Sequence, residues 1–323
     1  MNKIYNPIYI QNYNIYDIFY NDRGNIVIIK PGGHCNINNI RMNNNGILVN
    51  FEVEICSHGH VHIYYLHNED FIYYEDKIYD IIIDNEIVST KINKYPDFEN
   101  EIIMSTVVKN EDKYILQWIK YHNNLGIKRF IIYDNSTDNT LYTLLNNNIT
   151  DNIFIVINWQ YEHIFQQTQQ NHSIYAFNKS KYIGLFDIDE YINLQEPYIE
   201  IDNFISDIIK IDDVNIDTIG GFQLLNKLFF NPNNLPDDNY NFLKIYNCDT
   251  VSLYGRAKCF VIPKNVKTFS VHVITKGLPI KYIGENYAYF NHYIFLNKTD
   301  RGFNNTPYTD NSIERFIKLF NLS

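Results

Sequence analysis

The stretch Tyr182–Tyr191 most constrains the fold, because a short apolar run in it ends abruptly in three carboxylates. The run is too short for a helix of its own and is bounded by polar residues, so it is predicted to be a buried strand. Asp187 and Asp189 fit poorly inside such a strand, because an unpaired charge in an apolar interior is very unfavourable. We therefore place both carboxylates just past the strand's end, where open α/β sheets bind their ligands.

The pair Asp187 and Asp189 puts two hard oxygen ligands on nearly the same side of the chain. Such ligands suit Mg²⁺ or Mn²⁺ bridging a phosphate. An acidic turn that simply follows a core strand, without any ligand, is the alternative that a motif this short leaves open.

Composition limits the class of protein. The 323 residues suffice for one large or two medium domains, and 45% hydrophobic with 16% aromatic residues exclude general disorder. The net charge of -10 argues against a general nucleic-acid or anionic-membrane surface. The four cysteines lie far apart without a CxxC pair, which favours a reducing compartment.

The N-terminus lacks the basic, apolar and small-residue layout of a signal peptide, and no apolar run approaches the roughly 18 residues of a membrane span. The excess of Asn, Ile and Tyr is typical of an AT-rich genome, such as that of a large DNA virus or a protist. The expected location is the cytoplasm or, for a viral protein, the host cytoplasm or the virion. The sequence does not predict an oligomeric state.

Residues 1–97 are predicted to form a small β-rich accessory domain whose role stays open. Short β-type runs such as Ile26–Lys30 and Val61–Leu66 alternate with Gly, Asn and Asp, which indicates an antiparallel sheet or small sandwich. The polar segment Ser89–Asn100, in which Pro96 stops regular structure, reads as the linker to the next domain.

Residues 98–323 change in character and are predicted to form an α/β domain. Strand patterns at 101–108, 130–133, 153–157 and 182–186 alternate with helical patterns at about 114–125, 139–146 and 163–177. This β-α-β-α-β-α-β order predicts a mostly parallel sheet flanked by helices, with the loops that follow the strands gathered at one edge. Asp187 and Asp189 would line a pocket at that edge.

An ordered series of motifs over residues 101–302 resembles the nucleotide-sugar-dependent glycosyltransferases of the GT-A fold, most closely glycosyltransferase family 92 and the related family 2-like group. The matching segments are 107–111 (VVKNE), 118–126 (WIKYHNNLG), 132–138 (IYDNSTD), 166–171 (QQTQQN), 186–191 (FDIDEY), 258–263 (KCFVIP) with 271–272 (VH), 291–293 (NHY) and 298–302 (KTDRG). Tyr191 departs mildly from the usual Phe, and the segment between His272 and His292 is unusual, which leaves the acceptor side in doubt.

The resemblance implies a metal-dependent transfer of a hexose from a UDP-sugar to a glycan or protein-linked acceptor, with inversion at the sugar carbon. Asp187 and Asp189 would hold Mn²⁺ or Mg²⁺ on the diphosphate. Asp189 is also expected to be a catalytic residue. His272 would be the third metal ligand, with His292 as the alternative. Glu190 would face the pocket, orient a metal-bound water, or serve a structural role.

The resemblance also implies donor contacts. Asn110 and Glu111 would meet the nucleoside, although Glu111 also suits the positive end of a helix. Asp134 would bind uracil or ribose. Lys258, Arg301 and Lys298 would contact the diphosphate, where cations stabilise developing charge, unless they are surface charges.

The catalytic base is open, because an inverting transfer needs a carboxylate and four candidates after the metal motif are not ranked. These are Asp237, Asp238, Asp249 and Glu285, of which Glu285 and Asp249 are carried forward. Two other functions stay open: a phosphatase or phosphotransferase with Asp187 as nucleophile, and a sugar-binding protein without turnover.

Overall fold

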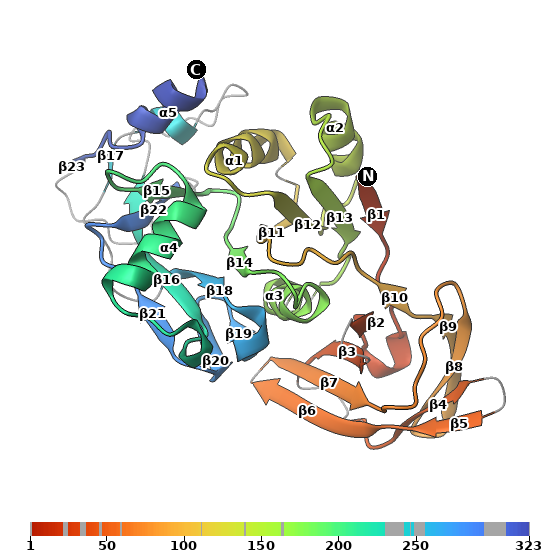
Figure 1. Ribbon diagram of the computed structural model, residues 1–323. Coiled ribbons are helices and arrows are strands. Elements are labelled where there is room, and N and C mark those ends of the chain that lie inside the picture. Colours follow the sequence, from red (N-terminus) through yellow and green to blue (C-terminus); the bar gives the residue numbers. More distant parts are fainter. Residues whose placement is uncertain are drawn as a thin grey trace.

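The computed structural model describes residues 2–21, 25–32, 37–44, 47–58, 60–110, 112–138, 140–162, 165–229, 242–245, 247–248, 256–293 and 308–322. A large sheet, flanked by helices, occupies one part of the molecule, and two smaller, mostly antiparallel sheets lie beside it (Figure 1). No helix within these ranges has the length and apolar character needed to cross a membrane.

The large sheet has a parallel core. Its order is β1 (Lys3–Tyr5), β13 (Phe154–Asn158), β12 (Arg129–Asp134), β11 (Ile102–Val108), β14 (Tyr182–Leu185), β18 (Lys258–Val261) and β16 (Gly221–Phe229). The pairs from β1 to β14 are parallel, and β18 runs antiparallel to both of its neighbours. Along the chain, β11, β12 and β13 are laid down in one direction across the sheet, and β14 then returns to the other side of β11. Sheets of this kind place their ligand site at such a reversal.

The sheet continues through a second group of strands around β16. Here β22 (Ala288–Tyr293) lies parallel to β16 and antiparallel to β15 (Glu190–Leu194). The remaining members are β21 (Ile280–Tyr282), β17 (Asn247–Cys248) and β23 (Tyr308–Thr309). A separate hairpin is formed by β19 (Val266–Ser270) and β20 (Val273–Gly277).

Both faces of the parallel strands are buried, which explains why they read as apolar runs and not as alternating ones. Helices α1 (Asp112–Asn124) and α2 (Leu141–Asn148) contribute to the core on one face, together with Met104 and Phe130. Helix α3 (Phe165–Ala176) covers the other face, where Ile103 and Ile131 are buried. Helices α4 (Ile201–Ile211) and α5 (Glu314–Phe320) pack against the first of these two cores. The predicted α/β fold of the GT-A type, with a β-rich region before it, is confirmed.

The β-rich region is a small sandwich, as the sequence indicated. One sheet has the order β10 (Asn93–Lys94), β2 (Asp17–Asn21), β3 (Asn25–Pro31), β7 (Val61–His67) and β6 (Glu52–His58). The other has the order β5 (Ile47–Asn50), β4 (Ile40–Asn44), β8 (Ile78–Ile83) and β9 (Glu86–Lys91). The apolar residues Ile18, Ile28 and Ile81 belong to the core that the two sheets share. The far face of the first sheet packs with α3 through Phe19 and Val27.

The two regions are joined more closely than the predicted division at residue 97 implies. Strand β1 lies in the large sheet, where Ile4 pairs with Val156, before the chain enters the sandwich. An ion pair of 2.7 Å between Lys267 Nζ and Glu54 Oε1 links the β19–β20 hairpin to the edge strand β6. A cut at residue 97 would therefore remove a strand of the large sheet.

Asp310 connects the C-terminal segment to the large sheet through hydrogen bonds. Its carboxylate accepts hydrogen bonds from Lys227 Nζ (2.5 Å), Tyr289 Oη (2.7 Å) and the Ser312 backbone N–H (2.9 Å). Burial would raise the pKa of Asp310, but the hydrogen bond from Lys227 and those within the turn outweigh it and lower the pKa to about 2. Because the folded-state pKa lies below the unfolded value, this stability is present above about pH 4 and is lost as the pH falls through about 2.

We expect Asp310→Asn to lower the free energy of unfolding at pH 7 by about 2 kcal/mol, the equivalent of this pKa shift. The difference from the wild type is expected to shrink toward zero near pH 2. Urea unfolding at pH 7, 4 and 2.5 measures it, with the exposed Asp151→Asn as the control. A difference between Asp310→Asn and wild type that stays constant over this range would contradict the assignment.

Candidate functional site

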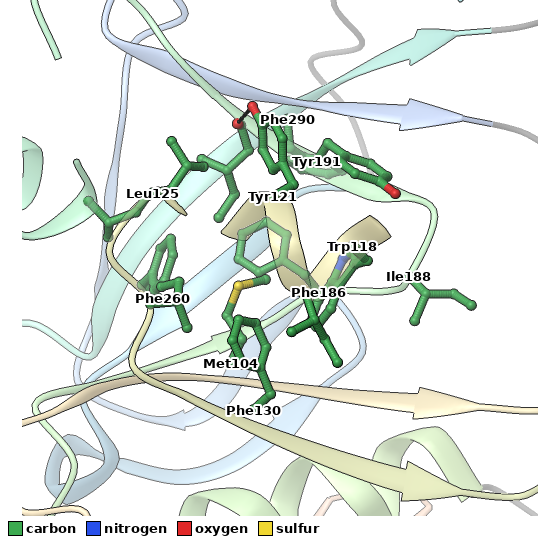
Figure 2. Close-up of a cluster of buried hydrophobic side chains, with 14 of the residues drawn as sticks. Met104, Trp118, Tyr121, Leu125, Phe130, Phe186, Ile188, Tyr191, Phe260 and Phe290 are labelled. Carbon is green, nitrogen blue, oxygen red and sulfur yellow. Dashed lines mark hydrogen bonds between the residues drawn. The ribbon is translucent and has the colours of Figure 1, made fainter. Parts of the chain in front are cut away.

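The acidic motif lies at the carboxyl end of β14, where the sequence placed it. Phe186 and Ile188 point into the core beneath it, and the Phe186 ring lies 5.4 Å from that of Phe260 (Figure 2). Asp187 follows Phe186 just past the end of β14, and Asp189 lies in the turn that leads into β15, where the Glu190 N–H donates to the Asp187 carbonyl at 3.1 Å. The side chains of Asp187 and Asp189 are 36% and 21% exposed.

Each oxygen of the Asp187 carboxylate accepts a hydrogen bond from a side chain. Gln166 Nε2, in the first turn of α3, donates to Oδ1 at 2.9 Å, and Lys258 Nζ donates to Oδ2 at 2.7 Å. The Lys258 side chain is fully buried, and its ammonium also lies 3.5 Å from Glu190 Oε2. The backbone N–H of Asp187 donates to that same oxygen at 2.9 Å. Asp187, Glu190 and Lys258 therefore form one connected unit, in which Lys258 and Glu190 are buried and Asp187 is partly exposed.

Charges within this unit set the pKa values. Burial would raise the pKa of Asp187, but the charge and hydrogen bond of Lys258 hold it below its ordinary value. Burial dominates for Glu190 and raises its pKa to about 8, even though Lys258 acts against it. The pKa of Lys258 is raised, because the attraction of Asp187 and Glu190 exceeds the effect of burial.

A second cluster adjoins the first. Ligand atoms of Asp189, Glu190 and His292 all lie within 4.8 Å of one another. The antiparallel pairing of β15 with β22 sets Glu190 opposite His292, and His292 Nε2 lies 3.5 Å from Asp189 Oδ2. Burial would lower the pKa of His292, but the charge of Asp189 and its hydrogen bond raise it overall. Two carboxylates and an imidazole that meet in this way form a candidate site for a divalent cation.

His292 carries a polar atom that the rest of the described chain leaves without a hydrogen-bond partner. This atom is Nδ1, which is shielded from solvent, and its nearest acidic oxygen is Glu190 Oε1 at 3.7 Å. A buried polar atom without a partner is unfavourable, unless a ligand outside the protein satisfies it. The donor set of oxygens with one imidazole nitrogen fits Mn²⁺ or Mg²⁺.

His272, which the sequence ranked above His292, lies near the charged unit but outside this cluster. Its Nδ1 is 3.1 Å from the Ala257 carbonyl oxygen, which fixes Nδ1 as the donor. Burial lowers the pKa of His272, and the charge of Lys258 lowers it further. Because ligand atoms of His292 lie within 4.8 Å of those of Asp189 and Glu190, we carry His292 forward as the third candidate ligand.

Helix α1 holds the strand that carries Glu190, through residues that the sequence analysis treated only as core positions. Trp118 Nε1 donates to the Glu190 carbonyl at 3.0 Å, and Tyr121 Oη donates to the Ile192 carbonyl at 2.7 Å. The Ile192 N–H donates to His122 Nε2 at 3.3 Å. The spacing of polar-tipped aromatic residues at i, i+3 and i+4 on one helix face was the available signal for this role.

Asn110 and Asp134, two of the predicted nucleoside contacts, lie at the ends of β11 and β12 and bind residues of the loop that follows β12. Asn110 Oδ1 accepts from the Thr137 N–H at 3.1 Å, and the Asn110 N–H donates to Ser136 Oγ at 3.0 Å. Asp134 is 2% exposed, and its Oδ1 accepts from the Ser136 N–H at 2.9 Å. Burial raises the pKa of Asp134. In this structure these residues shape the loops between the two strand ends.

Two predicted roles need correction. Lys258 was expected to contact a diphosphate directly, but its fully buried ammonium is bound by Asp187 and Glu190 instead. Glu285 was a candidate base, but it precedes β22 at the Leu194–Ala288 end of the β15–β22 ladder. That end lies about 13 Å from Glu190 at the usual rise per residue, so the ladder does not bring Glu285 to the acidic motif.

Other predicted residues lie outside the described residues, and the structure says nothing of them. These are Glu111, Asp237, Asp238, Asp249, Lys298 and Arg301.

A parallel α/β sheet with a carboxylate–imidazole cluster at its strand ends places the protein among the α/β proteins that bind ligands at a switch in strand order. A model of glycosyltransferase family 92 matches residues 102–319. Because this match covers more than half of the chain, the protein belongs to glycosyltransferase family 92, and the predicted resemblance is confirmed.

Curated relatives match over shorter segments. A glycosyltransferase family 92 protein of Ricinus communis is 28% identical over 100 residues, which are 29% of this chain and 16% of that protein. One from Arabidopsis thaliana is 25% identical over 107 residues, 31% of this chain and 18% of that protein. The matched segments thus span less than a fifth of the relatives' length.

Solved structures are similar only in outline. HddC from Yersinia pseudotuberculosis has a TM-score of 0.33 at 9% identity, over 58% of this chain and 92% of that one. The glucosyl-3-phosphoglycerate synthase from Mycobacterium tuberculosis, crystallised with Mn²⁺, UDP and glucosyl-3-phosphoglycerate, has a TM-score of 0.26 at 14% identity, over 41% and 45%. S. aureus TarS has a TM-score of 0.29 at 15% identity, over 69% and 64%.

Proposed function

We propose that the protein transfers a hexose from a UDP-sugar to a glycan or protein-linked acceptor, with Mn²⁺ or Mg²⁺ as cofactor and inversion at the sugar carbon. The observation that supports this best is the cluster of Asp189, Glu190 and His292 at the carboxyl ends of the parallel strands. Membership of glycosyltransferase family 92 supplies the reaction class. The nucleotide, the sugar and the inversion are parts of the proposal.

Asp189 and His292 are the proposed principal metal ligands. Both side chains are partly exposed, at 21% and 15%, whereas Glu190 is only 1% exposed. Each oxygen of Asp187 already accepts one hydrogen bond, from Gln166 or Lys258, so Asp187 is less available to a metal ion than Asp189. We therefore assign Asp187 to orienting the site, with direct ligation as its alternative role.

A bound divalent ion would neutralise the charge that develops on the leaving diphosphate. The chain's own residues prepare for this. Lys258 offsets the repulsion between Asp187 and Glu190, and Trp118 and Tyr121 hold the backbone of β15 in place. His292, whose pKa is raised by Asp189, would release its proton on binding a metal ion, so binding is expected to weaken as the pH falls. Asp249 remains our candidate base.

The proposal predicts joint stabilisation by metal and nucleotide. With UDP and Mn²⁺ at about 100 times their dissociation constant, binding adds about 2.7 kcal/mol and raises the Tm by roughly 5 °C. A thermal scan with UDP alone, Mn²⁺ alone, both together and GDP with Mn²⁺ measures this. The largest shift is expected with UDP and Mn²⁺ together. No shift with any nucleoside diphosphate and Mn²⁺ would contradict the proposal.

Turnover distinguishes a transferase from a sugar-binding protein. A screen of UDP-glucose, UDP-galactose and their N-acetylated forms is expected to identify one donor that is consumed. The readout of this screen is the release of UDP. Removal of the metal with EDTA should stop UDP release, and added Mn²⁺ should restore it. A donor that binds but never releases UDP with any acceptor offered would favour the binding protein.

A further inference from the structure

Helix α3 is unusual because its polar side chains are buried. Six consecutive polar residues are at most 3% exposed: Thr168, Gln169, Gln170, Asn171, His172 and Ser173. Burial of polar groups is unfavourable unless hydrogen bonds compensate for it. The side chains of this helix therefore matter for what they bind, and they bind two different parts of the molecule.

One face of α3 is tied to the β-rich region through a fully buried Asp–His pair. His172 Nε2 lies 2.9 Å from Asp17 Oδ2, and neither side chain is exposed. His172 Nδ1 lies 2.6 Å from Tyr133 Oη in the large sheet. The carboxylate of Asp17 also accepts from Tyr95 Oη at 2.6 Å and from the Ile8 N–H at 2.8 Å.

Asp17 therefore collects donors from both crossings between the two regions. Ile8 belongs to the segment that leaves the large sheet, and Tyr95 belongs to the segment that returns to it. The pair with His172 connects both crossings to a single position on α3. A shift of β2 would change the hydrogen bonds that hold this position.

The other polar side chains of α3 bind the acidic site and the β19–β20 hairpin, whose turn contains His272. Gln166 donates to Asp187, six residues and about 9 Å along the helix from His172. Gln167 Nε2 donates to Ser270 Oγ at 3.0 Å. Asn171 donates to the Phe269 carbonyl at 2.8 Å and accepts from the Phe269 N–H at 2.9 Å.

The position of α3 allows it to act on both sides. It lies between the sandwich strands β2 and β3 and the hairpin strands β19 and β20 (Figure 1). Its amide side chains form hydrogen bonds with Asp187 and with the hairpin, and hydrogen bonds depend on direction. A rotation or an axial shift of the helix would therefore displace Asp187 and the hairpin together. The register of α3 is thus shared by the β-rich region and the site.

We propose that Asp17 and His172 are positioning residues for the acidic site, and that the β-rich region acts through them to fix the register of α3. Neither residue touches a reacting group. The proposal rests on the proposed function for its catalytic meaning, whereas its structural part, the coupling of Asp17 to the β19–β20 hairpin, does not. A purely structural role for the pair would instead lower stability without a specific effect on the hairpin.

The test compares full-length variants matched in Tm. Asp17→Asn and His172→Gln alter the buried pair, and Tyr95→Phe removes one donor to Asp17 as a milder change. Ile81→Ala is the control, because Ile81 is buried in the sandwich core that lies away from α3. Ile81→Val replaces it if its loss of Tm matches better.

The first readout is hydrogen exchange of residues 266–277, which requires neither metal nor nucleotide. We expect exchange there to be at least tenfold faster in Asp17→Asn and His172→Gln, to change in the same direction in Tyr95→Phe, and to stay at the wild-type rate in the control. If Asp17→Asn and His172→Gln do not fold, Tyr95→Phe against the control decides. Equal effects in variant and control, or none in the variants, would overturn the proposal.

The second readout is the affinity for Mn²⁺ in the presence of UDP. We expect a weakening of about tenfold in Asp17→Asn and none in the control. A wild-type protein that binds neither Mn²⁺ nor UDP would refute the proposed function, while hydrogen exchange would still decide the coupling. Unchanged affinity in Asp17→Asn, where the wild type does bind, would overturn the positioning role.

Discussion

Asp189→Asn is expected to lower UDP release from the donor sugar by at least about 100-fold, since changes even to groups that only support a metal ligand weaken metal sites by 10- to 100-fold. The substitution keeps the size of the side chain but removes the charge that faces His292 at 3.5 Å. Because Asp189 lies at the surface end of the motif and is 21% exposed, the fold should tolerate the change. Steady-state kinetics over a range of Mn²⁺ concentrations measures the effect.

The matched control for this variant is Asp207→Asn on α4, where the carboxylate is 48% exposed and pairs with Lys210 on the same helix. It is expected to keep wild-type activity. A partial recovery of Asp189→Asn at high Mn²⁺ would fit weakened metal binding. Wild-type rates in Asp189→Asn at limiting Mn²⁺ would remove Asp189 from the site.

Lys258→Met is expected to lower the free energy of unfolding by about 3–5 kcal/mol, the usual effect of removing one partner of a buried ion pair. The ammonium is fully buried, and the Glu190 carboxylate that it faces is 1% exposed. Without Lys258, the Asp187 carboxylate loses the cation that holds its pKa below the ordinary value, and the buried Glu190, whose pKa is about 8, loses its partner. Urea unfolding at pH 7 measures the loss.

A double variant identifies the cause. Adding Asp187→Asn to Lys258→Met should recover part of the lost stability, because it removes the carboxylate whose charge Lys258 balances. The control Lys210→Met alters an exposed ammonium, 75% accessible, and should change stability by less than about 1 kcal/mol. A loss in Lys258→Met as small as in this control would contradict the account of the buried unit.

The parallel part of the sheet could be predicted because its strands are buried on both faces. That burial makes segments such as Ile102–Val108 and Arg129–Asp134 read as apolar runs between helices of regular spacing. Strand β1 could not be predicted to join them. Its three residues carry no periodic signal, and its partner in β13 lies about 150 positions further along the chain.

The acidic motif was visible because its chemistry is local in the sequence. The roles of its neighbours depend on tertiary contacts that no spacing reveals. Lys258 reaches Asp187 because β18 pairs with β14, and His292 reaches Asp189 because β22 pairs with β15. Resemblance alone therefore ranked His272 first and placed Lys258 on the diphosphate. The buried partner of His172 was equally invisible, since Asp17 lies in a region outside the matched motifs.

The central claim is that Asp189 and His292 hold a divalent cation at the strand ends. Electron spin-echo modulation of bound Mn²⁺, recorded with UDP present, tests it most directly, because it detects a coordinated imidazole nitrogen. We predict a nitrogen modulation in the wild type and in His272→Gln, and its loss in His292→Gln. Modulation that persists in His292→Gln, or an absence of bound Mn²⁺ in the wild type, would contradict the claim.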